Sequence, residues 1–549
     1  MDTEEFRKRG KEMVDYLCEY METLSCRPVT STVHPNYLRD LLPQEAPVNP
    51  EPWDDIIADL EHKIMPGITH WQHPRFHAYF SSAASYPAIL GDMISGIIGC
   101  MGFSWVASPA ITELETIVLD WFGKAIGLPQ SFLSDSNGGG VLQGSASECV
   151  LVAMLAARDQ ALNRLYEENP SEHKASHLPK LVAYCSKEAH SCVEKAAIIS
   201  LVTLRKLEPD SNSSLRGEIL SKAIEEDEAK GLVPFMVSGI LGSTGSCSFD
   251  NLEEIGRVAK KHGCWLHVDA AYAGSAFICP EFQHLLNGIE LVDSFNTNPT
   301  KWLLMNFDCS CLWVKDRKKI IKSFSVNALY LESEYEGMVH DYRHWGIPLS
   351  RRFRSLKMWF VFRCYGISGL QQYIRNHVRL AQLFESHVRK DERFEVLNDV
   401  RMGLVCFRLK GKGDKVTAHL LANINHSGKL HMIPARIKGK FIIRFAMNAQ
   451  PGTEGDIDYA WSVISRYATL LLLHPKISPR ILCHIPPTPQ GHNLRERFSF
   501  TRSVSRDVFK RLGNELHDGA NPVIILDEDE DINDPCEDSE NAVREEEHI

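Results

Sequence analysis

One lysine of this 549-residue chain stands among residues that favour burial. Lys301 follows an Asn-Pro-Thr turn and precedes Trp, Leu, Leu and Met in "SFNTNPTKWLLMNFD" (294–308). Burial disfavours the charged ammonium group and lowers its pKa, which leaves a lysine as a nucleophilic amine. A surface lysine whose stem covers an apolar patch explains the segment equally well, so the rest of the chain has to decide.

Other residues suited to chemistry lie in loops that follow short apolar runs. Asp269 follows such a run in "CWLHVDAAYAG", and His190 lies in the loop "CSKEAHSCVEKAA". "GGGVLQGSASE" supplies glycines and then Ala146 and Ser147, before a helical stretch whose free N–H groups can hold a phosphate. Each feature alone also has an ordinary explanation, such as a helix-capping aspartate or a plain loop histidine.

Together these features fit one chemistry. A lysine amine, a carboxylate for a ring nitrogen, a ring that stacks on a cofactor and a phosphate cradle are the parts of a pyridoxal-phosphate site. In this interpretation Lys301 carries the cofactor.

The rival pattern "HWQHPRFH" places His70, His73 and His77 at a spacing that suggests a metal site. Pro74 interrupts the helix that would align them, so we expect them to line a pocket and expect no metal.

The helices and strands that must position these residues can be predicted from the sequence. Helical stretches alternate with short apolar runs between residues 86 and 360. This alternation predicts α/β units around a largely parallel sheet, with ligands at the carboxyl ends of the strands. The expected strands are 180–186, 232–240, 264–270 and 309–316 in this domain, and 403–411 and 440–448 in a smaller α/β domain.

Four regions are therefore expected along the chain. The predicted regions are an N-terminal helical segment (1–85), a large cofactor-binding domain (86–360), a small C-terminal α/β domain (361–475) and a disordered tail (476–549). The tail contains the basic stretch "RERFSFTRSVSR", whose hydroxyls near arginines suggest phosphorylation and a phospho-dependent partner. A solvated tail without function is the alternative.

Composition restricts the partners and the compartment. Residues 527–549 hold twelve acidic residues and one arginine, which equals the whole net charge of −11, so the remaining body is neutral. A neutral body argues against nucleic-acid binding. No apolar run reaches the roughly 20 residues of a membrane span, and the charged N-terminus lacks the apolar region of a signal peptide. With fifteen scattered cysteines expected as free thiols, the predicted compartment is cytoplasmic.

Several stretches between residues 1 and 475 closely resemble the group II pyridoxal-phosphate amino acid decarboxylases, which make biogenic amines. The matching stretches are "HAYF", "GFSWVASPAITELE", "QGSASE", "AHSCVEKA", "HVDAAYAGSAF", "NPTKW", "NFDCS" and "DYRHWGIPLSRRFRSLKMW". Within that family, "THWQHPRFHAYF", "CSKEAHSCVEKAA" and "YGISGLQ" are most similar to invertebrate tyrosine decarboxylases, which make tyramine.

The resemblance implies a type I aminotransferase-like fold and a homodimer with active sites at the subunit interface. It also implies that Lys301 holds the cofactor, Asp269 pairs with the ring nitrogen, His190 stacks on the ring and Ala271 packs on the other face. By the same resemblance, the phosphate surroundings are Ala146, Ser147 and Asn298, Thr244 lies beside the cofactor, and the substrate pocket contains Trp71, Tyr79, Phe80, Ser82 and Phe103.

Tyr330, in "SVNALYLESEYEGMVHDY", matches the tyrosine on the family's mobile catalytic loop. Loss of CO₂ leaves a carbanion that must be protonated at Cα, and a phenol positioned by loop closure can supply that proton while excluding water. A tyrosine that only packs is the alternative interpretation of Tyr330.

Three positions bear on which member of the family this is. Thr300 stands where the family often has histidine, which affects only fine tuning. His190 is the decarboxylase residue, whereas insect relatives that form aldehydes carry asparagine there. Ser350 matches a position that is usually glycine in dopa decarboxylases and serine in histidine decarboxylases. Its hydroxyl narrows the pocket and disfavours a catechol, so tyrosine is the expected substrate, with histidine or a broad aromatic range as alternatives.

Two other classes of protein remain open. An inactive relative would keep the fold as a binding protein, and an aminotransferase would share the cofactor. The presence of Lys301, Asp269, His190 and Tyr330 favours the decarboxylase.

Overall fold

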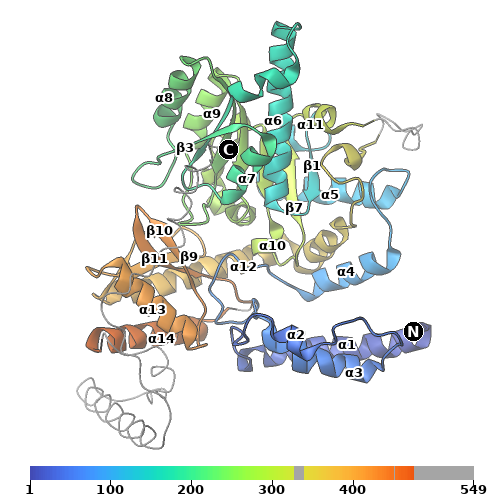
Figure 1. Cartoon of the computed structure of the whole chain (residues 1–549), viewed down its shortest axis with the longest axis vertical. Coiled ribbons are helices and arrows are strands. Elements are labelled where there is room, and N and C mark those ends of the chain that lie inside the picture. Colours follow the sequence, from blue (N-terminus) through green and yellow to red (C-terminus); the bar gives the residue numbers. More distant parts are fainter. Residues whose placement is uncertain (327–338, 451, 475–549) are drawn as a thin grey trace, which may run out of the picture. The chain divides into compact units, whose positions relative to one another are not determined.

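The computed structural model describes residues 1–326, 339–450 and 452–474. Its centre is a seven-stranded sheet with the strand order β1-β7-β6-β5-β4-β2-β3 (Figure 1). All strands run in one direction except β7, which is antiparallel to both of its neighbours. The strands are β1 (Gly139–Gln143), β2 (Leu181–Ser186), β3 (Thr203–Leu207), β4 (Val233–Ile240), β5 (Trp265–Asp269), β6 (Ser294–Thr297) and β7 (Ser310–Val314).

The four strands expected in this region are confirmed as β2, β4, β5 and β7. The strands β1, β3 and β6 were not predicted. β6 has the sequence Ser-Phe-Asn-Thr, and all four residues are buried although three of them are polar. β1 begins with two glycines. Strand signals depend on apolar and β-branched residues, so glycine-rich and polar strands inside a sheet give no such signal.

Helices cover both faces of this sheet. Alternate strand residues point to opposite faces, so Leu181 and Ala183 of β2 join one apolar cluster while Val182 and Tyr184 join the other. The first cluster packs against α6 (Ala146–Glu168), α7 (Ser191–Ser200) and α11 (Arg317–Phe324). The second packs against α5 (Pro109–Ala125), α8 (Gly217–Glu228), α9 (Leu252–Lys261) and α12 (Ser355–Lys390).

A second, antiparallel sheet of four strands follows, in the order β10-β11-β9-β8. The predicted strands at 403–411 and 440–448 are confirmed as its two central strands. Helix α12 leads from the large sheet to this one and changes direction at Gly366, where φ is 65°. The elements here are β8 (Phe394–Val396), β9 (Leu404–Leu409), α13 (Asp414–His426), β10 (Ile433–Ile437), β11 (Lys440–Ala446) and α14 (Glu454–Leu473).

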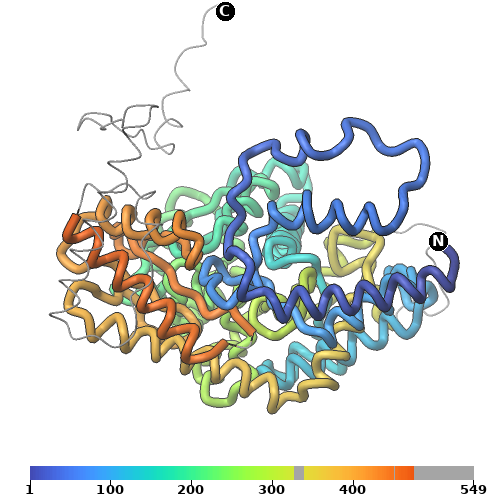
Figure 2. Tube along the Cα trace, turned by 90° about the horizontal axis from the view of Figure 1, so that it is seen from below, coloured from blue at the N-terminus to red at the C-terminus, as the bar shows by residue number. Residues whose placement is uncertain are grey.

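The N-terminal segment is helical, as predicted. Its first helix, α1 (Thr3–Thr23), is capped by Asp2 and buries none of its side chains. Figure 2 shows this segment in blue as a helix, a long loop and a return helix. Tyr16 on α1 donates a hydrogen bond to Glu61 across 2.7 Å, which joins the two helical parts. The remaining helices are α2 (Tyr37–Leu41), α3 (Trp53–Asp59), α4 (Tyr86–Ile98) and α10 (Pro299–Trp302).

Backbone hydrogen bonds fasten the end of this segment to both sheets. The amide of Ala83 donates to Thr300, beside Lys301, across 2.7 Å, and the amide of Ala446 on β11 donates to His77 across 3.1 Å. Residues near 80 therefore lie where the two sheets meet. The boundaries of the four predicted regions stay a prediction. None of the helices in the described ranges combines the length and apolar character of a membrane span.

Candidate active site

Lys301 and Asp269 lie at the carboxyl ends of adjacent parallel strands. Asp269 is the last residue of β5, and Lys301 lies on the short helix α10 that follows β6. Asp269 pairs in register with Asn296 of β6, and the amide of Asn298 donates to the carbonyl of Ala271 across 3.0 Å. The two strand-end loops are thus joined, which brings both predicted residues to one place, as strand-end placement requires.

The protein around Lys301 lowers its pKa. The largest cause is burial, and the positive charge of Arg444 acts in the same direction, while Asp269 and Cys192 oppose the shift. A lowered pKa increases the fraction of neutral amine, which is the form that attacks a carbonyl carbon. The apolar setting of Lys301 in the sequence therefore has a chemical consequence.

Asp269 is held by one of its two carboxylate oxygens. Oδ1 accepts hydrogen bonds from the amide of Ala271, at 3.0 Å, and from Nδ2 of Asn296, at 3.2 Å. No residue in the described ranges donates a hydrogen bond to Oδ2. The carboxylate is thus fixed in orientation and offers one free oxygen to a protonated ring nitrogen.

His190 caps the N-terminus of α7, in the loop that follows β2. Its Nδ1 accepts a hydrogen bond from the amide of Cys192 at 3.1 Å, so the proton of the neutral ring is on Nε2. Burial lowers the pKa of His190, and the charge of Lys301 lowers it further while Asp269 raises it. The ring is neutral at pH 7 and lies within electrostatic reach of both Lys301 and Asp269.

The N-terminus of the 23-residue helix α6 lies near Cys192, Asp269 and Lys301. Ser145 caps it by accepting from the amide of Glu148 at 3.2 Å. Burial raises the pKa of the Cys192 thiol to about 12, Asp269 raises it further, and Lys301 and a hydrogen bond with Ser147 lower it. None of the described residues accepts a hydrogen bond from the amide of Ala146 or Ser147. These amides and the helix dipole suit a phosphate.

Asn298 and Thr244 complete the loops at this edge of the sheet. Asn298 is buried, and its side-chain oxygen accepts from the hydroxyl of Ser310, which in turn contacts Cys149 of α6 at 3.2 Å. Thr244 lies in the loop after β4, the strand next to β5. The carboxylate, the amine, the neutral ring and the helix N-terminus together fit pyridoxal phosphate.

The N-terminal segment contributes two groups of stacked aromatic residues, and one of them reaches the residue next to Lys301. Phe80 stacks on Tyr272 with ring centroids 3.6 Å apart, and Tyr272 stacks on Trp302, the residue after Lys301, at 4.6 Å. Trp71 stacks on Tyr79 at 5.2 Å, and both side chains are exposed. A nearby polar contact comes from the carbonyl of Ser82, which accepts from the Gln72 amide group.

Phe103 and Ser350 belong to a different part of the molecule. The amide of Gly102 donates to the carbonyl of Arg351 across 3.0 Å, so the two predicted pocket residues lie near each other. Within the described ranges, no hydrogen bond or ring contact links Phe103 to Lys301 or Asp269. Residues Ile347 and Pro348, just before Ser350, do line a hollow with Ser147 and Cys192. Tyr330 lies outside the described residues.

Arg444 on β11 is a site residue that the sequence interpretation missed. Its side chain is 2% exposed, and its buried Nε and Nη2 have no hydrogen-bond partner among the residues that the structure describes. The guanidinium lies over the ring of Phe80 at 4.9 Å, and its charge contributes to the low pKa of Lys301. An arginine inside the apolar run "FIIRFAM" is the signal that could have identified it.

The three histidines of "HWQHPRFH" make separate contacts. Nδ1 of His70 bonds to the hydroxyl of Tyr20 at 2.8 Å, Nδ1 of His73 accepts from the amide of Arg75, and Nδ1 of His77 bonds to the Ala446 carbonyl. Burial lowers the pKa of His73 to about 4 and that of His77 to about 3. His73 and His77 are buried and fasten the segment to its neighbours, and among the described residues no group of metal-ligating side chains is present.

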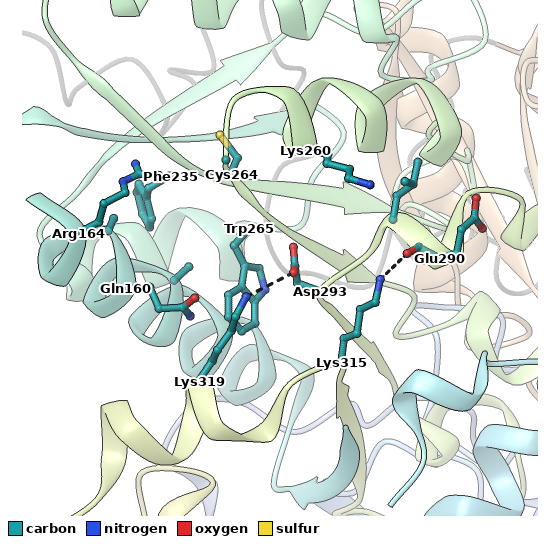
Figure 3. Close-up of a pocket in the computed structure, with 14 residues that line it drawn as sticks. Gln160, Arg164, Phe235, Lys260, Cys264, Trp265, Glu290, Asp293, Lys315 and Lys319 are labelled. Carbon is teal, nitrogen blue, oxygen red and sulfur yellow. Dashed lines mark hydrogen bonds and ion pairs between the residues drawn. The ribbon is translucent and has the colours of Figure 1, made fainter. Parts of the chain in front are cut away.

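A separate cavity of about 400 Å³ lies at the opposite end of the strands (Figure 3). Phe235 and Trp265, near the N-terminal ends of β4 and β5, line it together with Lys315 and Lys319. The amine of Lys319 lies over the Trp265 ring at 5.5 Å. None of the predicted site residues lines this cavity.

The fold and site define a pyridoxal-phosphate enzyme of the type I fold, and comparisons with known proteins identify the family. The family described as "Pyridoxal-dependent decarboxylase conserved domain" matches residues 35–410. The chain therefore belongs to the pyridoxal-dependent decarboxylase family, as predicted, and pyridoxal phosphate is its cofactor.

Individual relatives are similar over almost the whole described chain. Identity to the aromatic-L-amino-acid decarboxylase of Mus musculus is 53% over 476 residues, or 86% of this chain and 99% of the relative. Identity to the histidine decarboxylase of Drosophila melanogaster is also 53%, over 86% of this chain and 56% of the relative. The structure of Catharanthus roseus tryptophan decarboxylase in complex with L-tryptophan matches with a TM-score of 0.81 and 38% identity, covering 85% of this chain and 99% of that one.

These relatives establish amino acid decarboxylation as the reaction class. The finer expectation of a tyrosine decarboxylase stays a prediction, since the relatives named are aromatic-L-amino-acid, histidine and tryptophan decarboxylases.

Proposed function

We propose that this enzyme decarboxylates L-tyrosine to tyramine. The observation that carries the proposal is Ser350, which lies two residues beyond Pro348, and Pro348 lines the hollow beside Ser147 and Cys192. We expect the Ser350 hydroxyl to lie close to the substrate ring, where it would narrow the space beside the ring and add a polar partner. A single phenol hydroxyl fits such a pocket better than the two adjacent hydroxyls of a catechol.

The chain's own residues support the chemistry in distinct ways. Pyridoxal phosphate, when bound, supplies the electron sink for the carbanion that loss of CO₂ leaves. Lys301 provides the neutral amine that holds the cofactor. Oδ2 of Asp269 would accept a hydrogen bond from the protonated ring nitrogen, since Oδ1 already accepts two hydrogen bonds. His190 offers a neutral ring surface for stacking, and Tyr330 donates the proton to Cα.

Histidine is the second candidate substrate. Ser350 is also the residue that histidine decarboxylases carry at this position, and one relative at 53% identity is a histidine decarboxylase. Initial rates of CO₂ release with equal concentrations of tyrosine, dopa and histidine separate the candidates. We expect the highest kcat/KM with tyrosine, and a Ser350→Gly variant should gain activity on dopa relative to tyrosine. A higher kcat/KM with histidine would refute the proposal.

Product analysis separates decarboxylation from the other classes of protein. Tyramine and CO₂ in equal amounts are expected, whereas a keto acid would indicate an aminotransferase. Absence of any product with the loaded protein would indicate a binding protein.

We also propose that the enzyme is a homodimer whose active sites need both subunits. One side of α4 presents apolar side chains to solvent, which favours coverage by another protein surface. Phe103, a predicted pocket residue, follows this helix and lacks a described contact with Lys301, so a second copy would bring it to the site. The exposed apolar residues of α4 are Leu90, Met93, Ile94, Ile97 and Ile98.

The dimer proposal has a direct test. Ile97, at 77% exposure, is the most accessible of these residues. Ile97→Glu should shift the sedimentation coefficient from that of a dimer to that of a monomer and reduce turnover together with it. An exposed apolar residue of the small domain, Leu473→Glu, serves as the matched control. A parent protein that sediments as a monomer while fully active would contradict the proposal.

The cytoplasmic compartment and a phospho-dependent partner of the tail stay predictions. The stretch that suggested the partner lies outside the described residues.

A further inference from the structure

A line of buried polar side chains lies behind Asp269 on β5 and β6. His267 and Asp269 point to one face of β5, and they pair in register with Ser294 and Asn296 of β6. His267, Ser294 and Asn296 have no solvent exposure. Nε1 of Trp265 donates to Oγ of Ser294 at 2.7 Å, and Nδ1 of His267 lies 2.8 Å from the same Oγ. At the other end, Nδ2 of Asn296 donates to Asp269 at 3.2 Å.

The chemistry of the groups fixes the direction of these hydrogen bonds. The indole of Trp265 can only donate, and the carboxylate of Asp269 can only accept. Because Asn296 directs its nitrogen to Asp269, its oxygen remains for another donor. Among the described residues, neither this buried oxygen nor the buried Nε2 of His267 has a hydrogen-bond partner. Burial lowers the pKa of His267 to about 4, while the negative charge of Asp269 and the side chain of Asn296 act in the opposite direction.

Buried polar groups require partners, and pairing these two atoms with each other is the arrangement that would satisfy both. In that arrangement the neutral His267 ring would carry its proton on Nε2 and donate it to Asn296, and the hydroxyl of Ser294 would donate to Nδ1. Every donor then points the same way, from Trp265 through Ser294, His267 and Asn296 to Oδ1 of Asp269. Consecutive hydrogen bonds in a buried chain polarise one another and strengthen the last one.

We propose that Ser294, His267 and Asn296 are positioning residues that hold the carboxylate of Asp269 oriented toward the cofactor's ring nitrogen. The inference rests on the family's pyridoxal phosphate and on Asp269 as the partner of its ring nitrogen, and it is independent of the substrate. This series of hydrogen bonds from Trp265 to Asp269, here called the relay, keeps Oδ1 of Asp269 occupied, so that Oδ2 is the oxygen that faces the cofactor ring. A carboxylate without these donors would be free to rotate, and its interaction with the ring nitrogen would weaken.

The test compares two cofactors that differ at one atom. Apo-enzyme is titrated with pyridoxal phosphate and with its 1-deaza analogue, in which a C–H group replaces the ring nitrogen, and the dissociation constants are measured by fluorescence quenching. Loss of a hydrogen bond to a charged group corresponds to about a tenfold change or more in affinity. Asn296→Ala and His267→Leu should weaken binding of pyridoxal phosphate about tenfold and leave binding of the analogue within about twofold.

Matched variants separate the relay from a general effect of the core. His267→Gln keeps an N–H donor near the position of Nε2 and should restore most of the affinity. Ser238 is the control for Ser294. Ser238 is buried on β4 and lies in register with His267, but its own hydroxyl has no hydrogen-bond partner among the described residues. Ser294→Ala should weaken pyridoxal phosphate binding, and Ser238→Ala should not.

The outcomes discriminate between the possible roles. Equal weakening of both cofactors would show that these residues only support the fold, and unchanged binding of both would show that Asp269 needs no relay. Either result overturns the proposal. Because the measurement uses no amino acid substrate, it is unaffected if the enzyme's substrate is not tyrosine.

Discussion

The buried ion pair between Arg351 and Glu115 offers the sharpest test of what holds the segment around Ser350 in place. The Arg351 and Glu115 side chains are 5% and 1% exposed. The guanidinium donates to both carboxylate oxygens, to Oε2 at 3.0 Å, and also to the carbonyl of Leu142 at 2.8 Å. Arg351→Met keeps much of the volume but leaves a buried carboxylate with the amide of Leu142 as its remaining described partner.

The expected loss follows from that geometry. Removing one partner of a buried ion pair costs about 3–5 kcal/mol in free energy of unfolding. The double variant Glu115→Gln/Arg351→Met removes the stranded charge and retains an oxygen that accepts from Leu142. We therefore expect the double variant to be more stable than Arg351→Met, with a loss from the parent of about 1–2 kcal/mol.

Urea denaturation at one fixed protein concentration measures these differences. The control is Arg379→Met, which breaks a surface ion pair with Glu454 whose partners are 52% and 63% exposed. Exposed pairs contribute roughly 0–1 kcal/mol, so this variant should resemble the parent. If Arg351→Met unfolds at the same urea concentration as Arg379→Met, or if the double variant is no more stable than Arg351→Met, the reasoning is refuted.

Four further predictions concern the site, the pH response and the tail. Borohydride reduction of the loaded enzyme should fix the cofactor on Lys301, and mass spectrometry of Lys301→Ala should find no reduced adduct; an adduct on another lysine would contradict the assignment. Burial lowers the pKa of His77 to about 3, so between about pH 6.5 and 3 the unfolded chain binds a proton at this residue that the folded chain does not. As the pH falls through this window, His77 should therefore reduce the free energy of unfolding by roughly 1.4 kcal/mol per pH unit. His77→Gln should make that decrease less steep, and the same decrease in both proteins, measured by urea denaturation at several pH values, would disprove the prediction. Tyr330→Phe should bind cofactor and substrate and release some CO₂ but yield little amine and, in air, some aldehyde and ammonia; amine formation at the parental rate would assign the proton to another group. Truncation after residue 480 should leave turnover intact, and a large loss would place the tail in the catalytic body.

Prediction of the fold from the sequence succeeded where strands are apolar and failed where they are not. β2, β4, β5 and β7 are short apolar runs bounded by turns, a signal contained within a few residues. β6 carries Ser294, Asn296 and Thr297 as buried polar residues. Burial of polar side chains is favourable only when they find hydrogen-bond partners. Ser294 and Asn296 find theirs on β5, in residues that are distant in the sequence.

The sequence by itself determined which chemical groups the enzyme carries and that each stands at the end of a strand. Lys301, Asp269 and His190 were found in this way, because a strand end and the residue types after it are local properties. Only the tertiary structure decided that β5 and β6 are neighbours, that Oδ2 of Asp269 is the free oxygen, and that Arg444 enters the site from the second sheet. The physical reason is that strand order, burial and pKa shifts depend on groups that the fold brings together from distant parts of the chain.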